Sequence, residues 1–162
     1  MKLVSMLALS AGLILAPVAH AQISCQQVQD LMEAATEDFD SIADEEVSDS
    51  VYASSFELAG ASQCQVTYDL SSTYACAWTF DSLASARADY GRQAAALGVC
   101  LAGWERDAFE PSADDPKFQR LEGLSFFQED DEDGLMTWTA YLEEHIDGDT
   151  HDWHVWLGVD YF

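Results

Sequence analysis

Basic side chains are scarce in this chain of 162 residues, which carries six lysines and arginines against 30 aspartates and glutamates, for a formal net charge of −24. Nucleic-acid binding depends on neutralising phosphates with lysine and arginine, and docking on anionic lipid needs the same positive charge. The composition argues against both kinds of partner. Three interpretations of the acidity remain: a solvated surface that keeps the protein soluble, attraction of a cationic protein partner, or cation binding.

Sequence patterns typical of catalytic nucleophiles are also missing. The chain contains neither a Gly-x-Ser-x-Gly elbow nor a Cys-x-x-Cys pair, and beyond its first 21 residues it has only three histidines. The elbow is the local sequence that presents the serine of an α/β hydrolase. We therefore expect a protein that is not an enzyme and that carries no cofactor.

The N-terminal 21 residues have the pattern of a secretory signal peptide. Lys2 supplies a positive start, residues 3–18 form an apolar run, and Ala19-His20-Ala21 matches the small-x-small pattern of a cleavage site. The run is too short to span a bilayer. We predict cleavage after Ala21, no membrane insertion of the mature chain, a periplasmic or secreted location, and a single domain over residues 22–162.

Four cysteines lie in the predicted mature chain, at Cys25, Cys64, Cys76 and Cys100. An even number in an exported chain indicates two disulfides. If the helix after Phe80 runs back along the preceding strand, its end approaches Cys76, which favours Cys76–Cys100 together with Cys25–Cys64. The rival pairing, Cys64–Cys76 with Cys25–Cys100, fits the same pattern almost as well and stays open.

Hydrophobic periodicity predicts two helices. Ser24 and Gln27 form a capping box, and an apolar stripe follows at three- and four-residue spacing as far as Ile42. We expect this helix to end at the acids 44–46. The second helix begins after Asp81 or Ser82 and stops near Gly103.

Alternating apolar and polar residues predict the strands. Residues 63–69 and 74–80 form the clearest hairpin, and residues 51–58 are a weaker candidate. Residues 104–122 suggest a long surface connection, followed by strands at 123–129, 135–144 and 151–160. Turns are expected at 130–134 and 147–149. The order indicates an α+β fold: an antiparallel sheet of five to six strands packed by two helices on one face.

The last predicted strand offers the most specific binding surface. Side chains alternate across a strand, so Asp152, His154, Trp156, Gly158 and Asp160 share the face opposite the core row. With Tyr141 on the neighbouring strand, an aromatic group surrounded by acids is typical of a surface that binds a basic protein. The first functional hypothesis is therefore an inhibitor- or immunity-like protein whose partner is a basic exported protein. The alternative is that Trp156 packs beneath the connection or against Tyr141.

Two other functions remain open. His145 and His151 flank the last turn and would face each other across it, close to Asp147, Asp149 and Asp152. Imidazole and carboxylate groups are ligands for divalent metals, so this hairpin suggests a metal-dependent hydrolase. His154 would lie on the opposite face from His151. The third hypothesis is a structural envelope protein without a soluble ligand.

Overall fold

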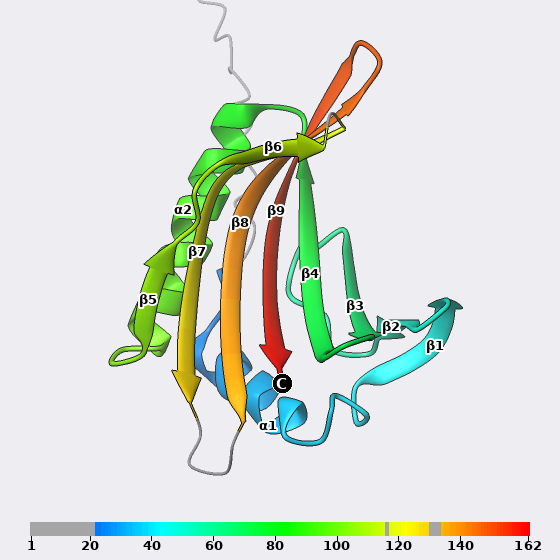
Figure 1. The fold of residues 1–162 in the computed structure, drawn as a ribbon, viewed down its shortest axis with the longest axis vertical. Helices are drawn as coiled ribbons and strands as arrows, with labels where there is room; N and C mark the ends of the chain where they lie inside the picture. The colour runs from blue at the N-terminus through cyan, green and yellow to red at the C-terminus, as the bar shows by residue number, and fades with distance from the viewer. Residues whose placement is uncertain (1–21, 116, 130–133) are drawn as a thin grey trace, which may run out of the picture.

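A nine-stranded antiparallel sheet forms the framework of the computed structural model (Figure 1), which describes residues 22–115, 117–129 and 134–162. The predicted signal peptide and most of the predicted turn at 130–134 lie outside the described residues. The strand order is β1-β2-β3-β4-β9-β8-β7-β5, and β6 pairs with β7 beside this path. The α+β class and the antiparallel sheet are confirmed.

The elements follow in chain order. They are α1 (Cys25–Ala35), β1 (Ala43–Ser48), β2 (Val51–Ser54), β3 (Gln63–Tyr68), β4 (Ser72–Phe80), α2 (Leu83–Cys100), β5 (Glu105–Ala108), β6 (Ser112–Asp115), β7 (Phe118–Glu129), β8 (Leu135–Asp147) and β9 (Thr150–Tyr161).

Helix α1 begins as predicted but ends early. The Ser24 hydroxyl accepts a hydrogen bond from the Gln27 backbone at 3.2 Å, and the Gln27 amide oxygen accepts one from the Ser24 backbone at 3.0 Å, which completes the capping box. The helix ends at Ala35 because the backbone enters the left-handed region at Asp38 and Phe39, with φ of 52° and 61°. Phe39 is nevertheless fully buried. The apolar stripe therefore predicted burial correctly and the length of the helix wrongly.

The predicted strand count was too low because three strands, β1, β5 and β6, lack an apolar pattern in their sequences. Strand β1 contains the acids 44–46, where we expected only the end of a helix, and its side chains are almost all exposed. Strands β5 and β6, with the start of β7, occupy the predicted connection at 104–122. The sheet holds these segments through backbone pairing with β2 and β7, which requires no apolar side chains.

The two helices do not share the sheet as predicted. Helix α2 lies against β4, β8 and β9, whereas α1 contacts α2 and β9. Strands β1–β3 extend to one side of both helices (Figure 1). Near them, loop residues take over the packing: the rings of Phe39 and Phe56 each lie 6.2 Å from the ring of Tyr74.

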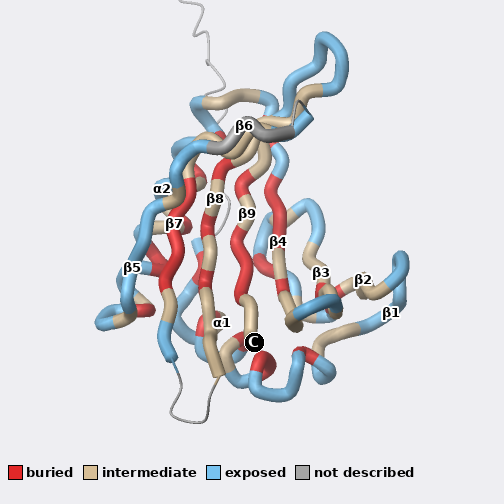
Figure 2. Tube along the Cα trace, viewed as in Figure 1, coloured by how far each residue is buried: buried red, intermediate tan, exposed pale blue. Residues whose placement is uncertain are grey.

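The core lies on the helix side of the sheet. Figure 2 shows buried backbone positions running through the long strands β4, β7, β8 and β9. We call this side the inner face. Its fully buried side chains include Tyr74, Cys76, Trp78, Trp138, Leu142, Val155, Leu157 and Val159. These residues recur at every second position of their strands, as the alternation predicts.

Two disulfides are present, but in the pairing that we did not favour. Cys64 lies directly opposite Cys76 in the β3–β4 hairpin, with their Cα atoms 4.1 Å apart. Cys25 bonds Cys100 across the start of α1 and the end of α2. The predicted Cys76–Cys100 and Cys25–Cys64 pairs are therefore wrong. Helix α2 leaves β4 and crosses toward β8 and β9, so its end does not return to Cys76.

Candidate functional site

The most distinctive cluster of polar and aromatic side chains lies on the outer face, which we define as the side of β4, β7, β8 and β9 opposite the inner face. Tyr141 and Trp156 are register partners on β8 and β9. Their rings stack with centroids 6.1 Å apart and planes 17° apart. Both side chains are only partly buried. Part of the alternative interpretation, that Trp156 packs against Tyr141, is therefore realised.

Arg120 extends this aromatic stack. Its guanidinium carbon lies 4.7 Å from the centre of the Tyr141 ring and 5.2 Å from the centre of the Phe109 ring. Cation–π attraction holds a guanidinium in such a position, and it is stronger when water is excluded. The Arg120 Nε atom is buried and has no hydrogen-bond partner within the described part of the chain. The arginine charge is thus directed at the neighbouring rings.

Sequence reasoning missed Arg120 and Phe109 because both lie in the segment predicted as a connection. An irregularity in the pairing of β7 also makes the position of Arg120 hard to predict. The register shifts between Arg120 and Glu122, so that Arg120 pairs with Glu143 while Gly123 pairs with Tyr141. This β-bulge breaks simple alternation and lets Arg120 and Gly123, three residues apart, both lie on the outer face. Gly123 is the local sign of this bulge in the sequence, because a glycine inside a strand often marks one.

A pair of histidines continues the outer face toward the β8–β9 turn. The rings of His145 and His154 stack with centroids 4.0 Å apart. The Glu143 carboxylate is hydrogen-bonded to Nε2 of His145, and Thr79 Oγ1 lies 3.4 Å from Nδ1 of His154. Phe118 packs edge-on against His145, with centroids 4.6 Å apart. Four strands therefore meet at this histidine pair.

Burial alters the acid–base properties of the outer face. It lowers the pKa of His154 below 6.5, and the neighbouring His145 lowers it further, against the opposing effects of Glu143 and Asp152. Burial also raises the pKa of Tyr141 to about 12. Near neutral pH, His154 and Tyr141 are therefore uncharged, and both can donate and accept hydrogen bonds.

Asp160 lies at the other end of the β9 row. Burial raises the pKa of its carboxyl group, while a 2.5 Å hydrogen bond donated by Thr73 acts in the opposite direction. Between Asp160 and Trp156 the outer face carries Gly158, whose register partners are Ala75 on β4 and Thr139 on β8. A row of small side chains therefore lies between Trp156 and the Asp160 carboxylate.

The structure brings together most of the sequence-predicted binding residues. Tyr141, Trp156 and His154 are contiguous, and Asp152 is the register partner of His145 at the edge of the histidine pair. Asp160 shares the outer face but lies four residues from Trp156, about 13 Å along an extended strand.

The histidine hairpin is not arranged as the metal hypothesis requires. His151 pairs with Ile146 in the register, so it lies on the inner-face side, where its Nδ1 is 2.8 Å from Glu144. His145 lies on the outer face. The prediction that these two histidines face each other is therefore wrong, whereas the placement of His154 opposite His151 is confirmed. Within the described ranges no cluster of three histidine, cysteine or acidic side chains is positioned to hold a metal.

Comparisons of the chain with protein-family models, with curated proteins and with solved structures found no significant match. Among the described residues, no helix combines the length and the hydropathy that a bilayer crossing needs. The two disulfides indicate an oxidising, extracellular environment.

Proposed function

We propose that this protein is a periplasmic or secreted binding protein, without enzymatic activity, that captures a cationic exported protein on its outer face, in the manner of an inhibitor or immunity protein. One observation carries the proposal: on β9 the partly exposed Trp156 lies between Asp152 and Asp160 on a single strand face, and neither of the two helices in the described part of the chain covers that face. Aromatic anchors surrounded by charge are typical of protein-binding surfaces.

The aromatic stack supplies a rigid platform. Each side chain of the stack contacts the next: Phe109 in the loop after β5, Arg120 on β7, Tyr141 on β8 and Trp156 on β9. A side chain that is already held in place loses little conformational entropy when a partner docks. The stack therefore presents the Trp156 ring in a prepared position.

The row at Gly158 suggests how a basic side chain would dock. A lysine or arginine of the partner would lay its aliphatic stem over the partly exposed Ala75 and Thr139, which flank the buried Gly158. It would contact Trp156 and place its charge beside Asp160. Attraction to the aromatic ring and to the carboxylate would act together. The net charge of −24 would speed the encounter by long-range attraction.

Affinity capture tests this function. The mature protein is immobilised and exposed at low salt to an envelope extract and to purified basic exported proteins, and bound partners are quantified. We expect capture that weakens at least about tenfold when salt rises enough to shorten the Debye length from roughly 10 Å to 3 Å. Trp156→Ala and Asp160→Asn should weaken it by a similar factor.

Asp30→Asn is the matched control for Asp160→Asn. It removes one negative charge from an exposed side chain of α1, away from the outer face. Capture that falls equally in both variants would indicate attraction by net charge alone. Capture that is insensitive to both Trp156→Ala and Asp160→Asn, or no capture at low salt, would contradict the proposal.

A further inference from the structure

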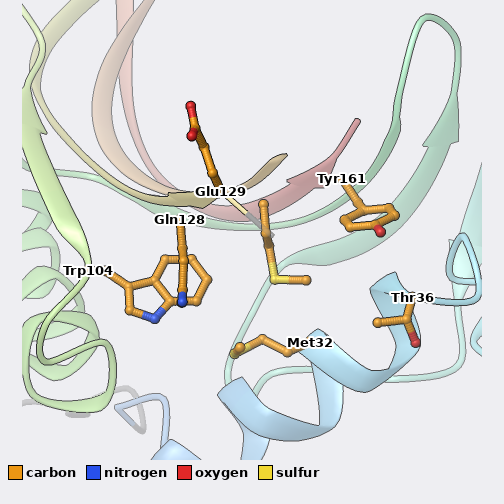
Figure 3. A pocket seen from close by; sticks show the side chains of 7 residues that line it. Met32, Thr36, Trp104, Gln128, Glu129 and Tyr161 are labelled. Carbon is orange, nitrogen blue, oxygen red and sulfur yellow. The ribbon is translucent and has the colours of Figure 1, made fainter. Parts of the chain in front are cut away.

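A cavity of about 310 Å³ opens at the end of the core that lies farthest from the β8–β9 turn (Figure 3). We call it the end cavity. Met32 and Thr36 of α1, Trp104 after α2, and the last inner-face positions of β7, β8 and β9 line it; these last three are Gln128, Met136 and Tyr161. It is separate from the outer face, and its occupant is independent of the proposed partner.

The end cavity exists because the strands extend beyond the ends of the helices that cover them. Phe126, Trp138 and Val159 form one register row across β7, β8 and β9, and all three are buried. The next row toward the strand ends continues the same inner face, but α1 has already ended at Ala35. The chain also turns away after α2 through Gly103, at φ of 98°. The inner face of the strands therefore extends beyond the part that the two helices cover.

The lining is mixed, with apolar, polarisable groups beside polar ones. Two thioethers, one indole and one phenol supply its apolar part, from Met32, Met136, Trp104 and Tyr161. Methionine adapts its shape to irregular ligands and makes favourable contacts with aromatic rings. The hydroxyl of Thr36 donates to the Glu33 carbonyl at 2.7 Å, so its methyl group faces the other lining side chains (Figure 3). The Gln128 amide adds donors and an acceptor to the lining.

Among the described residues that line the end cavity, Glu129 is the only ionised one. Its carboxylate points away from the other side chains (Figure 3). Alternation explains this orientation, because Gln128 occupies the inner-face position next to it. A wall without a counter-ion penalises burial of a charged group. The described lining therefore favours a neutral ligand, in contrast to the cationic partner proposed for the outer face.

We propose that the end cavity binds a neutral amphipathic small molecule, with an aromatic or aliphatic body and one hydroxyl or amide group. The volume is at the lower end of the range for ligand pockets, so one or two rings, or a medium alkyl chain, would fill it. The apolar body would pack between the two methionines and Trp104. The polar group would remain at the rim near Gln128.

Titration with N-phenyl-1-naphthylamine, a neutral dye whose emission rises in apolar surroundings, tests the site. We expect saturable binding of one dye per protein, with Met32→Gln and Met136→Gln each weakening it about tenfold. Val99→Gln, a matched change at a side chain that is 73% exposed on α2, should leave binding unchanged. Circular dichroism and thermal unfolding establish that each variant is folded.

A second variant keeps the test decisive if the methionine changes disturb folding. Thr36→Phe places a ring at the exposed rim without altering a buried position, and it should block the dye. Non-saturable binding, or saturable binding that persists in Thr36→Phe and in both methionine variants, would overturn the proposal. Capture of a cationic partner should be unchanged in Thr36→Phe, so failure of either proposal is recognised separately.

Competition establishes the ligand class. Octanol, octanoate and octylammonium share one chain and differ in charge, and each is added against the bound dye at high salt to screen long-range attraction. Octanol should displace the dye at least about tenfold more effectively than either ion. If octylammonium or octanoate competes as well as octanol, the ligand is not neutral and the inference is wrong.

Discussion

The ring of Phe109 lies directly against the backbone of Gly123, on the outer face of β7. A Cβ atom added at Gly123 would lie 3.1 Å from Cβ and Cγ of Phe109 and closer still to Cδ2. The Phe109 backbone nitrogen also donates to the Gly123 carbonyl at 3.0 Å. The absence of a side chain at Gly123 is therefore what lets Phe109 reach Arg120 and complete the aromatic stack.

This contact predicts that Gly123→Ala is destabilising. The added methyl group displaces Phe109, which has little room to move because it also packs on Arg120, and overpacking of this kind costs about 1–3 kcal/mol. Gly91→Ala on α2 is the matched control. Nothing lies within 4 Å of its added Cβ, so it should stabilise the helix by about 0.5–1 kcal/mol. Urea unfolding of the two variants measures both effects, and a stabilised Gly123→Ala would contradict the packing.

The two disulfides should differ in their contribution to stability. Cys25–Cys100 joins residues 75 apart and Cys64–Cys76 joins residues 12 apart. A longer closed loop removes more entropy from the unfolded chain. Replacing the first pair by alanine should lower the free energy of unfolding by about 4–5 kcal/mol, and replacing the second by about 3 kcal/mol. Urea unfolding checks the order, and peptide mapping without reduction should recover these two pairs alone.

Asp160 should make the protein less stable as pH rises. Its pKa in the folded state is raised above the ordinary 3.8 by burial. Between these two pKa values the folded chain holds a proton that the unfolded chain has released, so the free energy of unfolding falls with increasing pH. Asp160→Asn retains an acceptor for Thr73 and removes the titration. Its stability relative to the parent should therefore increase from acidic to neutral pH.

Thr73→Val keeps the titration of Asp160 and shifts its pKa. The Thr73 hydroxyl lowers the pKa of Asp160 by donating to the carboxylate, so its loss should raise that pKa and extend the pH-dependent range upward. Urea unfolding at several pH values measures both variants. Identical pH profiles for the parent and Asp160→Asn would refute the assignment.

His154 should have the opposite pH dependence. Its pKa in the folded state lies below the ordinary 6.5, chiefly because of burial and next because of His145. As pH falls through 6.5 the unfolded chain takes up a proton before the folded chain does, so stability is lost on acidification. Titration of the imidazole signals by NMR should show the lowered pKa. His145→Gln should raise it, and an unchanged value would exclude coupling between the two rings.

Several features of the fold followed from local patterns. The capping box at Ser24 and the inward row from Tyr74 to Phe80 were predicted correctly, and the N-cap of α2 was narrowed to Asp81 or Ser82, of which Ser82 is the cap. Each of these features depends on neighbouring residues alone. The turn at Gly148, where φ is 62°, was found for the same reason. Local chemistry determines caps, turns and the burial side of a strand.

The outer face was only half predictable. Alternation along β9 correctly grouped His154 and Trp156 on one side, and the neighbouring strand supplied Tyr141. Arg120 and Phe109 could not be added, because the bulge in β7 shifts the alternation and solvated strands show no apolar pattern. The pairing of His145 with His154, instead of His151, depends on the register of β8 and β9.

The sequence by itself determined the acidity of the protein, its α+β class, its cysteine framework and the burial side of its central strands. Tertiary structure decided which cysteine meets which, how the exposed strands join the sheet, and where the helices leave the strand ends uncovered to form the end cavity. The physical reason is that a residue pattern specifies which side of an element avoids water. Which residue of another element that side contacts is decided by strand register and helix length, and these depend on the packing of the whole chain.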